Sequence, residues 1–170
     1  EYRRLVNAAK VPQLSHILQT ICGTGIRVSE LQYITVEAAH SGVAEIALKG
    51  KIRTILLPTK LCRKLLKYAK KCGIVHRQIF LTKKENGLSR RFIWAEMKKL
   101  CEAARVARSK VFPHNLRGLF ARTFYAACRD VVRLADVLGH NSIETTRIYM
   151  LSTAKESARQ LDRLGLLSGW

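Results

Sequence analysis

The sequence predicts a mainly α-helical domain with one small antiparallel β-hairpin, which is an α+β fold. Through most of the chain, apolar residues recur at intervals of three and four, as they do on the buried face of a helix. Residues 43–48 and 52–57 instead have the composition of strands, and Lys49-Gly50-Lys51 between them suits a tight turn. The 170 residues are enough for one domain with a core of its own, over residues 1–170.

Two helices are expected before the hairpin. Residues 1–9 and 14–22 have helical spacing of apolar residues, and the Gly23-Thr24-Gly25 stretch is expected to end the second helix. Residues 27–31 then add one or two helical turns, in which Glu30 is polar among apolar neighbours.

A basic helix is expected directly after the hairpin, over residues 60–72. Thr59 can cap its N-terminus, and Gly73 is expected to end it. Its apolar stripe consists of Leu61, Leu65, Leu66, Ala69 and Cys72. Its basic residues, which fall largely on other faces, are Arg63, Lys64, Lys67, Lys70 and Lys71. Such a run is either a solvated face or a surface that contacts DNA.

The middle of the chain is expected to contain a short strand at residues 79–81 and a turn at Asn86-Gly87. A helix that begins at Ser89 or Arg90 then runs to Ala104. One side of this helix is apolar and consists of Ile93, Met97, Leu100, Cys101 and Ala104. Trp94 is expected in the core rather than in a DNA groove.

The last third of the chain is expected to be helical throughout, over residues 114–128, 131–138, 142–151 and 154–164. Gly139 ends the second of these helices. Ser142 is a natural N-cap for the third, with Glu144 in the first turn. The apolar segment 161–167 could pack onto a neighbouring molecule or fold back on its own domain.

The strong positive charge of the chain indicates either a polyanionic partner or a role of the charge in solubility. Lys and Arg number 31 against 12 Asp and Glu, which gives a formal net charge of +19. Nucleic acid is the first candidate partner, and an anionic membrane surface is the second. A transmembrane helix is excluded, because no run of about 18 apolar residues occurs.

The five cysteines are odd in number and include no CxxC pair. This pattern argues against a disulfide framework and against a zinc site. We therefore expect small buried thiols in a reducing cytoplasm.

Several polar residues are of the kinds that attack a phosphodiester without a metal. The acidic residues are scattered, so the sequence predicts no metal and no cofactor. Arginine can bind the phosphate oxygens instead, and Arg117 lies one helical turn after His114. Tyr149 could be the nucleophile if a base such as His114 takes its proton. His140 could donate to a phosphate oxygen, and Lys49 could protonate the leaving group.

Three stretches give this set a definite order: residues 24–31 (TGIRVSEL), 113–117 (PHNLR) and 138–149 (LGHNSIETTRIY). They resemble the three sequence boxes of the catalytic domain of tyrosine recombinases, the phage-integrase-type site-specific recombinases. Lys49-Gly50, followed by Arg53 and Pro58, is similar to the lysine hairpin of that family. The resemblance covers about residues 1–163. It departs from the family at Gly118, where a second histidine usually follows the box arginine.

The resemblance implies a mechanism. Tyr149 would attack a DNA phosphodiester, form a 3′-phosphotyrosyl link and free a 5′-hydroxyl, and another 5′-hydroxyl would then rejoin the strand without ATP or a divalent metal. The phosphoryl group would be bound by Arg27, Arg117 and His140. His114 would be the acid/base partner of the tyrosine, and Lys49, or else Lys51, would protonate the leaving oxygen. Glu30 would orient Arg27, or simply be a carboxylate at the start of a helical turn.

The resemblance also implies partners. Double-stranded DNA is expected to contact Lys51, Arg53, Arg63, Lys64, Lys67, Arg90, Arg91 and Lys98. The chain is expected to be the C-terminal domain of a longer cytoplasmic recombinase, encoded by a bacterium or phage, which forms tetramers on DNA. An N-terminal DNA-clamping domain would precede it, and residues 154–170 could be exchanged between protomers. Two alternatives stay open: a type IB topoisomerase-like enzyme, which reseals the same strand, and a non-catalytic DNA-binding module of this fold.

Overall fold

The computed structural model describes residues 1–48, 51–82, 87–140 and 142–147. The predicted positions Lys49 and Tyr149, the helix expected over 154–164 and the segment 161–167 lie outside the described residues. The helices and strands, in chain order, are α1 (Tyr2–Ala8), α2 (Pro12–Thr24), the 3₁₀ helix η1 (Val28–Tyr33), α3 (Val36–Ser41), β1 (Val43–Leu48), β2 (Lys51–Leu56), α4 (Thr59–Lys71), α5 (Arg90–Ala103), the 3₁₀ helix η2 (Arg108–Lys110), α6 (Pro113–Cys128), α7 (Val131–Leu138) and α8 (Ile143–Arg147).

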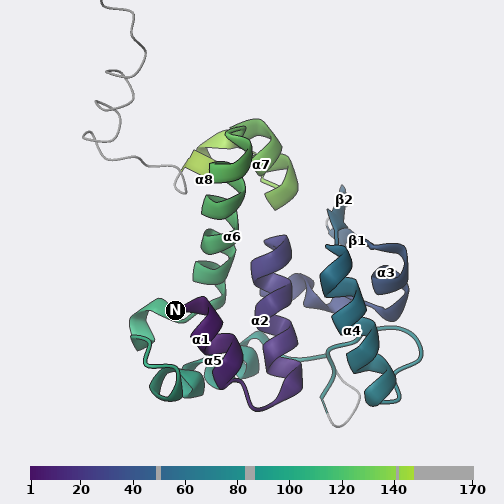
Figure 1. Ribbon diagram of the computed structural model, residues 1–170. Helices are drawn as coiled ribbons and strands as arrows, with labels where there is room; N and C mark the ends of the chain where they lie inside the picture. Colours follow the sequence, from purple (N-terminus) through teal and green to yellow (C-terminus); the bar gives the residue numbers. More distant parts are fainter. Residues whose placement is uncertain (49–50, 83–86, 141, 148–170) are drawn as a thin grey trace, which may run out of the picture.

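The expected α+β class is confirmed. Helix α2 runs through the middle of the part of the molecule that precedes α6. Helices α1 and α5 lie on one side of it, and α4 and the hairpin lie on the other (Figure 1). Helix α6 packs against α2 and continues beyond its end to α7 and α8 (Figure 1). Among the described residues, no helix is both long enough and apolar enough to cross a membrane.

The hairpin forms in the expected place, and its register determines which side chains face inward. β1 and β2 are antiparallel, with Val43 opposite Leu56 and Ile46 opposite Arg53. Successive side chains of a strand point to opposite faces. Ile46 and Ile55 are buried, whereas Leu56 is 74% exposed. The inner face of β2 therefore carries Ile55 and, two residues earlier, Arg53.

Buried apolar residues form two separate clusters of unequal size. The larger one spans α1 to the first half of α6 and includes Leu18, Ile34, Leu65 and Met97. The smaller one joins α6 to α7, and its buried members are Ala121, Leu134 and Leu138. Phe120, Phe124 and Tyr125 pack against this smaller cluster. The polar residues considered below lie where the two clusters meet.

Some local expectations were wrong. The one or two helical turns expected at residues 27–31 are present as the 3₁₀ helix η1, with Arg27 at its N-cap. Residues 79–81 form no strand, since this part of the chain makes only isolated bridges, Thr35 with Gln78 and Leu81 with Gly87. Helix α3 was not expected, although Thr35 marks its start by accepting a hydrogen bond from the Ala38 N–H at 3.0 Å.

The ends of α4 and the start of α5 agree with expectation only in part. Helix α4 already begins at Thr59, so Pro58 holds the cap position and the predicted Thr59 cap is wrong. The expected end at Gly73 is confirmed, since Gly73 has a φ of +71° and the Ile74 N–H donates to the Ala69 carbonyl at 2.9 Å. Ser89 caps α5 by accepting from the Phe92 N–H at 3.1 Å.

Not every residue placed in the core by the sequence is buried. Cys62 and Cys101 are buried, but Cys72 and Cys128 are exposed, so the expectation of buried thiols holds only in part. Trp94 was expected in the core and is 48% exposed, because it lies beside the buried stripe of α5 and not within it.

Candidate active site

Arg27 lies just beyond the end of α2, where Gly25 terminates the helix. Gly25 has a φ of +66°, and its N–H donates to the Ile21 carbonyl at 2.9 Å. A Cβ at this position would overlap the Phe120 ring and lie 3.0 Å from Leu138 Cδ2. Glycine therefore lets the end of α2 approach α6 and α7, and this approach places Arg27 beside the turn that follows α7.

Glu30 is a buried acid that binds Arg27 twice. Its side chain is 1% exposed, and it accepts from the Arg27 backbone N–H at 2.8 Å and from Arg27 Nη1 at 2.8 Å. Arg27 Nη2 donates to the Gly139 carbonyl at 3.3 Å. The Arg27 side chain is nevertheless 42% exposed, so a guanidinium oriented by the protein still faces solvent. The carboxylate thus makes both contacts that the sequence left as alternatives, one to the start of η1 and one to the arginine.

Arg117 is buried, with 4% of its surface exposed, and its guanidinium is held by backbone carbonyls. Nη1 donates to the Gly25 carbonyl, and Nη2 donates to the Leu138 carbonyl at 2.7 Å. These bonds join the end of α2 to the end of α7. Because a charged donor strengthens a hydrogen bond, they fix the direction of the guanidinium firmly.

His140 is neutral in this arrangement, with its proton on Nδ1. Nε2 lies 3.0 Å from Arg117 Nη2, and because a guanidinium can only donate, Nε2 accepts and carries no proton. Nδ1 lies 2.8 Å from Thr146 Oγ1 and is the donor of that pair. Burial is the main cause that lowers the pKa of the ring to about 4, and the positive charge of Arg117 is the next.

We expect the His140 ring to titrate near its lowered pKa of about 4 when followed by NMR, with His140→Gln used to assign its signals. The ordinary value for histidine is about 6.5, so between these two pH values the unfolded chain binds more protons than the folded chain. The stability that this group contributes is therefore complete above about pH 6.5 and is lost as the pH falls through that window. A midpoint above about pH 6 would contradict the neutral, Arg117-bound ring.

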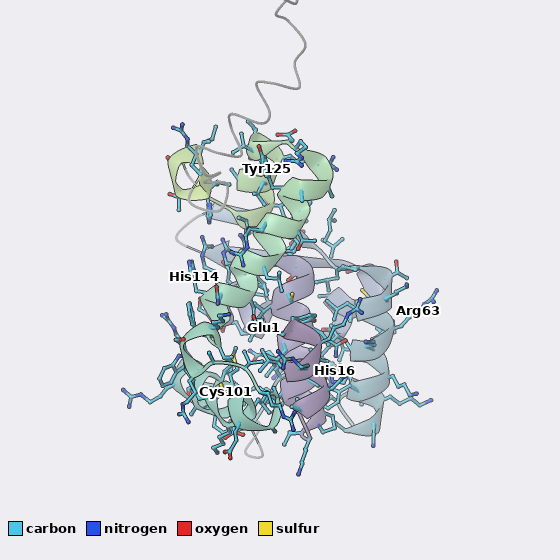
Figure 2. The ribbon with its side chains drawn as sticks, turned by 60° about the vertical axis from the view of Figure 1, so that its left-hand side comes forward. Glu1, His16, Arg63, Cys101, His114 and Tyr125 are labelled. Carbon is cyan, nitrogen blue, oxygen red and sulfur yellow. The ribbon has the colours of Figure 1, made fainter. Side chains whose placement is uncertain are left out.

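His114 and Arg117 line one cavity, as their spacing on a helix predicts. This cavity has a volume of about 840 Å³ and is also lined by Arg27, His140 and Trp94. His114 is exposed at the start of α6, at the side of the molecule in Figure 2. The structure thus brings together four of the predicted site residues, Arg27, His114, Arg117 and His140, around a single cavity.

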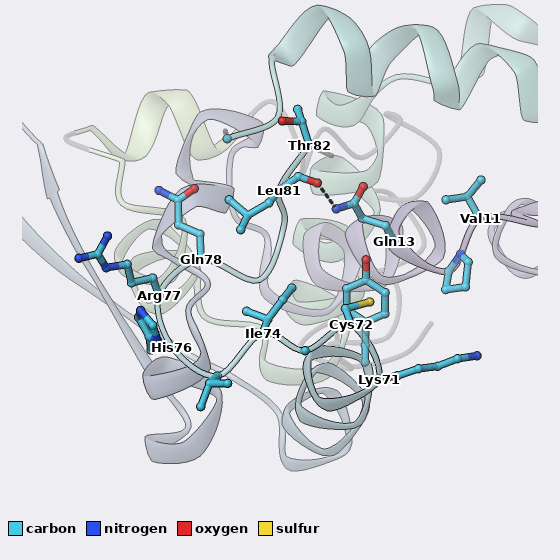
Figure 3. Close-up of a pocket in the computed structure, with 15 residues that line it drawn as sticks. Val11, Gln13, Lys71, Cys72, Ile74, His76, Arg77, Gln78, Leu81 and Thr82 are labelled. Atoms are coloured by element: carbon cyan, nitrogen blue, oxygen red, sulfur yellow. Dashed lines mark hydrogen bonds between the residues drawn. The ribbon is translucent and has the colours of Figure 1, made fainter. Parts of the chain in front are cut away.

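A second cavity, of about 910 Å³, lies between the start of α2 and the end of α4 (Figure 3). Gln13, Ile74 and Gln78 line it, and Gln13 Nε2 donates to the Leu81 carbonyl at 2.7 Å. None of its described lining residues is a predicted site residue. The predicted site residues Arg27, His114, Arg117 and His140 line the smaller cavity instead.

The predicted DNA-binding residues occupy three different places. Arg90 and Arg91, in the first turn of α5, line the cavity beside His114. Arg63, Lys64 and Lys67 are exposed on α4, and in Figure 2 Arg63 and His114 lie on opposite sides of the molecule. Lys98 lies 5.2 Å from the Trp94 ring centroid, within cation–π range, and also donates to the Arg108 carbonyl. Lys51 begins β2.

Arg53 is placed differently from a surface contact, since its side chain is only 15% exposed and its guanidinium binds Glu30 and the Leu138 carbonyl. Sequence reasoning also missed Thr146 and the carbonyls of Leu138 and Gly139. Thr146 could have been noticed, because it lies within residues 138–149 and is polar at a position six residues after His140. Contacts to backbone carbonyls cannot be predicted from sequence motifs, because every residue carries a carbonyl.

The sequence matches the model of the phage integrase family over residues 1–156. The tyrosine recombinase XerA of Pyrococcus furiosus is 32% identical over 158 residues, which cover 89% of this chain and 54% of that protein. The tyrosine recombinase XerH of Campylobacter jejuni is 32% identical over 143 residues, which cover 78% of this chain and 39% of that protein. The chain thus spans about half the length of the curated relatives it matches, or less.

Solved structures of such proteins share the fold. A crystal structure of XerA recombinase aligns with a TM-score of 0.79 at 21% identity, covering 98% of this chain and 62% of that one. A structure of XerH site-specific recombinase bound to its difH substrate, a pre-cleavage complex, aligns with a TM-score of 0.75 at 23% identity. That alignment covers 93% of this chain and 50% of the XerH chain.

Proposed function

The chain belongs to the phage integrase family, and on that basis we propose that it is the catalytic domain of a site-specific recombinase that cleaves and rejoins double-stranded DNA. The observation that carries the proposal is the cavity around which Arg27, Arg117, His140 and His114 gather. Two always-charged guanidinium groups and two imidazoles are suited to a phosphodiester, and the net charge of +19 suits DNA.

In the proposed reaction, Tyr149 attacks the phosphorus of the scissile phosphodiester. The tyrosine oxygen forms a bond to phosphorus as the bond to the 5′-oxygen breaks, which leaves a 3′-phosphotyrosyl link. His114 takes the proton of the tyrosine, and Lys49 (or Lys51) gives a proton to the leaving 5′-oxygen. A 5′-hydroxyl of a second duplex then reverses these steps. The phosphotyrosine conserves the bond energy, so no ATP is needed. In place of a metal or other cofactor, Arg27 and Arg117 would stabilise the charge on the phosphate oxygens.

Arg27 and Arg117 would bind the non-bridging oxygens as negative charge develops on them. Both are already oriented, by Glu30 and by the Gly25 and Leu138 carbonyls, so little reorganisation is needed when the phosphate arrives. We propose that both arginines bind the same phosphate group. Removal of one such donor typically slows a reaction roughly 100- to 1,000-fold.

His140 has two roles in this proposal. Before DNA binds, its neutral ring accepts from Arg117 and so orients that guanidinium. A bound phosphate would attract the Arg117 donor and, as a nearby negative charge, raise the pKa of His140. The protonated ring could then donate Nε2–H to a phosphate oxygen. Gly118, which is buried next to Arg117, would not take part directly.

The proposal extends beyond these 170 residues, because the chain spans only part of the length of the relatives it matches. We propose that the chain is the C-terminal catalytic domain of a longer cytoplasmic recombinase that clamps DNA with another domain and forms tetramers on it. In that assembly, residues 154–170 would contact a neighbouring protomer.

The experiment that tests the function uses a nicked suicide duplex in EDTA. On this substrate the strand end released by cleavage diffuses away, so the protein stays attached to the DNA. A covalent protein–DNA adduct on a denaturing gel, and strand transfer to a second duplex, are expected. A strict requirement for a divalent metal would contradict the proposed mechanism. Adducts without strand transfer would contradict the assignment of the protein as a recombinase.

For DNA binding, we expect Arg90→Gln/Arg91→Gln to matter more than an equal loss of charge on α4. If both arginines contact phosphates, the slope of log K against log salt should become shallower by about 1.8. Arg63→Gln/Lys67→Gln is the matched control, because it removes the same charge from exposed positions on α4, and Arg63 lies on the side opposite His114 in Figure 2. Salt titrations by fluorescence anisotropy measure both slopes, and an equal change in the two variants would contradict this placement of the DNA.

A further inference from the structure

Arg53 is a charged residue on the inner face of the hairpin. It pairs with Ile46 across the strands and lies two residues before the buried Ile55, so the alternation of β2 turns its side chain toward the interior. Its side chain is 15% exposed. A charge so far removed from water is costly unless it is fully paired, which makes the partners of Arg53 informative.

The first partner of Arg53 is the acid that orients Arg27. Arg53 Nη2 lies 2.6 Å from Glu30 Oε2, while Glu30 Oε1 binds Arg27 Nη1 at 2.8 Å. One carboxylate with 1% exposure thus holds two guanidinium groups that belong to η1 and β2. Without the carboxylate these two positive charges would repel each other across a poorly solvated space.

The second partner of Arg53 is the carbonyl that also holds Arg117. Arg53 Nη1 donates to the Leu138 carbonyl, which accepts from Arg117 Nη2 at 2.7 Å as well. The Arg53 side chain packs directly on Gly139, where any Cβ would overlap it. Gly139 also has a φ of +62°, so both its backbone and its lack of a side chain suit this contact.

We infer that Arg53 is a positioning residue, which holds the β1–β2 hairpin against the phosphate-binding arginines, and not a residue that contacts DNA. It is the central member of a continuous chain of contacts from Arg27 through Glu30 and the Leu138 carbonyl to Arg117. Only arginine can make both bonds, because its planar fork places two donors at a fixed angle whereas lysine offers one point charge.

This role deepens the proposed function and rests on it. A bound phosphate would meet Arg27 and Arg117, whose guanidinium groups share partners with Arg53. The hairpin strand that carries Arg53 is therefore tied to both ends of the phosphate site. A displacement of about 1 Å in such an arrangement can slow a reaction roughly 100-fold without loss of substrate binding.

The test compares Arg53→Gln with Arg122→Gln, which removes the same charge from an exposed position on α6. For Arg53→Gln we expect a DNA dissociation constant within about two-fold of the unmodified chain and an unchanged salt slope, because no phosphate contact is lost. Single-turnover cleavage of the nicked duplex should fall roughly 100-fold. Arg122→Gln should cleave at the unmodified rate. Arg53→Lys, which keeps the charge and guards against misfolding, should also cleave slowly.

Two results would overturn the inference. One is cleavage by Arg53→Gln and Arg53→Lys at the unmodified rate. The other is a salt slope that becomes shallower by about 0.9 in Arg53→Gln, as expected for a lost phosphate contact.

Amide hydrogen exchange without DNA separates failure of the inference from failure of the proposed function. Backbone amides of β1 and β2 should exchange faster in Arg53→Gln, while those of α2 should not change. If even the unmodified chain forms no adduct, the proposed function fails, and the exchange rates alone decide the role of Arg53. Unchanged exchange in the hairpin would then overturn it.

Discussion

Tyr149→Phe is expected to bind DNA as well as the unmodified chain does and to form no covalent adduct with a nicked suicide duplex. The substitution removes a single oxygen, and this oxygen is the proposed nucleophile. Attack by water in its place would leave no protein attached to the DNA. The expected effect is therefore complete loss of the adduct band, with an unchanged dissociation constant in a gel-shift titration.

Tyr125→Phe is the matched control for this experiment. Tyr125 lies on α6, half-buried, and its ring takes part in a cation–π contact with Arg129 that phenylalanine can retain. Its adduct yield should equal that of the unmodified chain. An adduct that persists in Tyr149→Phe would show that another residue is the nucleophile, whatever Tyr125→Phe does.

Arg117→Lys is expected to have the second-largest effect, although it conserves the charge. Lysine cannot reach the Gly25 and Leu138 carbonyls together, so at least one buried acceptor loses a charged donor. Such bonds are worth about 1.5–3 kcal/mol each, and the free energy of unfolding should fall by about that amount in a urea titration. Single-turnover cleavage should fall roughly 100- to 1,000-fold at a temperature where the variant remains folded.

Arg122→Lys, an exposed position on the same helix, provides the comparison for Arg117→Lys. It should be neutral in both stability and cleavage. If Arg117→Lys cleaved DNA at the unmodified rate, charge alone would suffice at this position, and the fixed direction of the guanidinium would have no catalytic value.

Much of the fold could be predicted because it follows from periodicity and from a few strong local signals. The stripe of Leu61, Leu65 and Ala69 predicts α4, and Gly73 predicts its end. The hairpin follows from two strand-like runs around a turn. Helix α3 was missed because six residues are too few to show a helical period, and its only signal is the capping Thr35.

The site could be predicted as a set of residues but not as an arrangement. The order of Arg27, His114, Arg117 and His140 indicates the chemistry, and the structure places the four around one cavity. Arg53 was predicted to contact DNA because it is a basic residue in a strongly basic chain. Arg53 lies two residues before Ile55 on the same strand, so the alternation of side chains already indicated that it points inward. The neutral state of His140 was beyond prediction, since it depends on the approach of Arg117 across the seam between α6 and α7.

A domain with two unequal apolar clusters does not have to unfold in one step. The smaller cluster has only Ala121, Leu134 and Leu138 as buried members, and guanidinium–carbonyl bonds connect it to the larger one. The candidate active site thus lies where these two clusters meet. Local opening around the smaller cluster would separate His140 and the Leu138 carbonyl from Arg27 and Arg117 while most of the chain remained folded. Heat or denaturant would then abolish catalysis well before global unfolding, and DNA bound across the joint would oppose that loss.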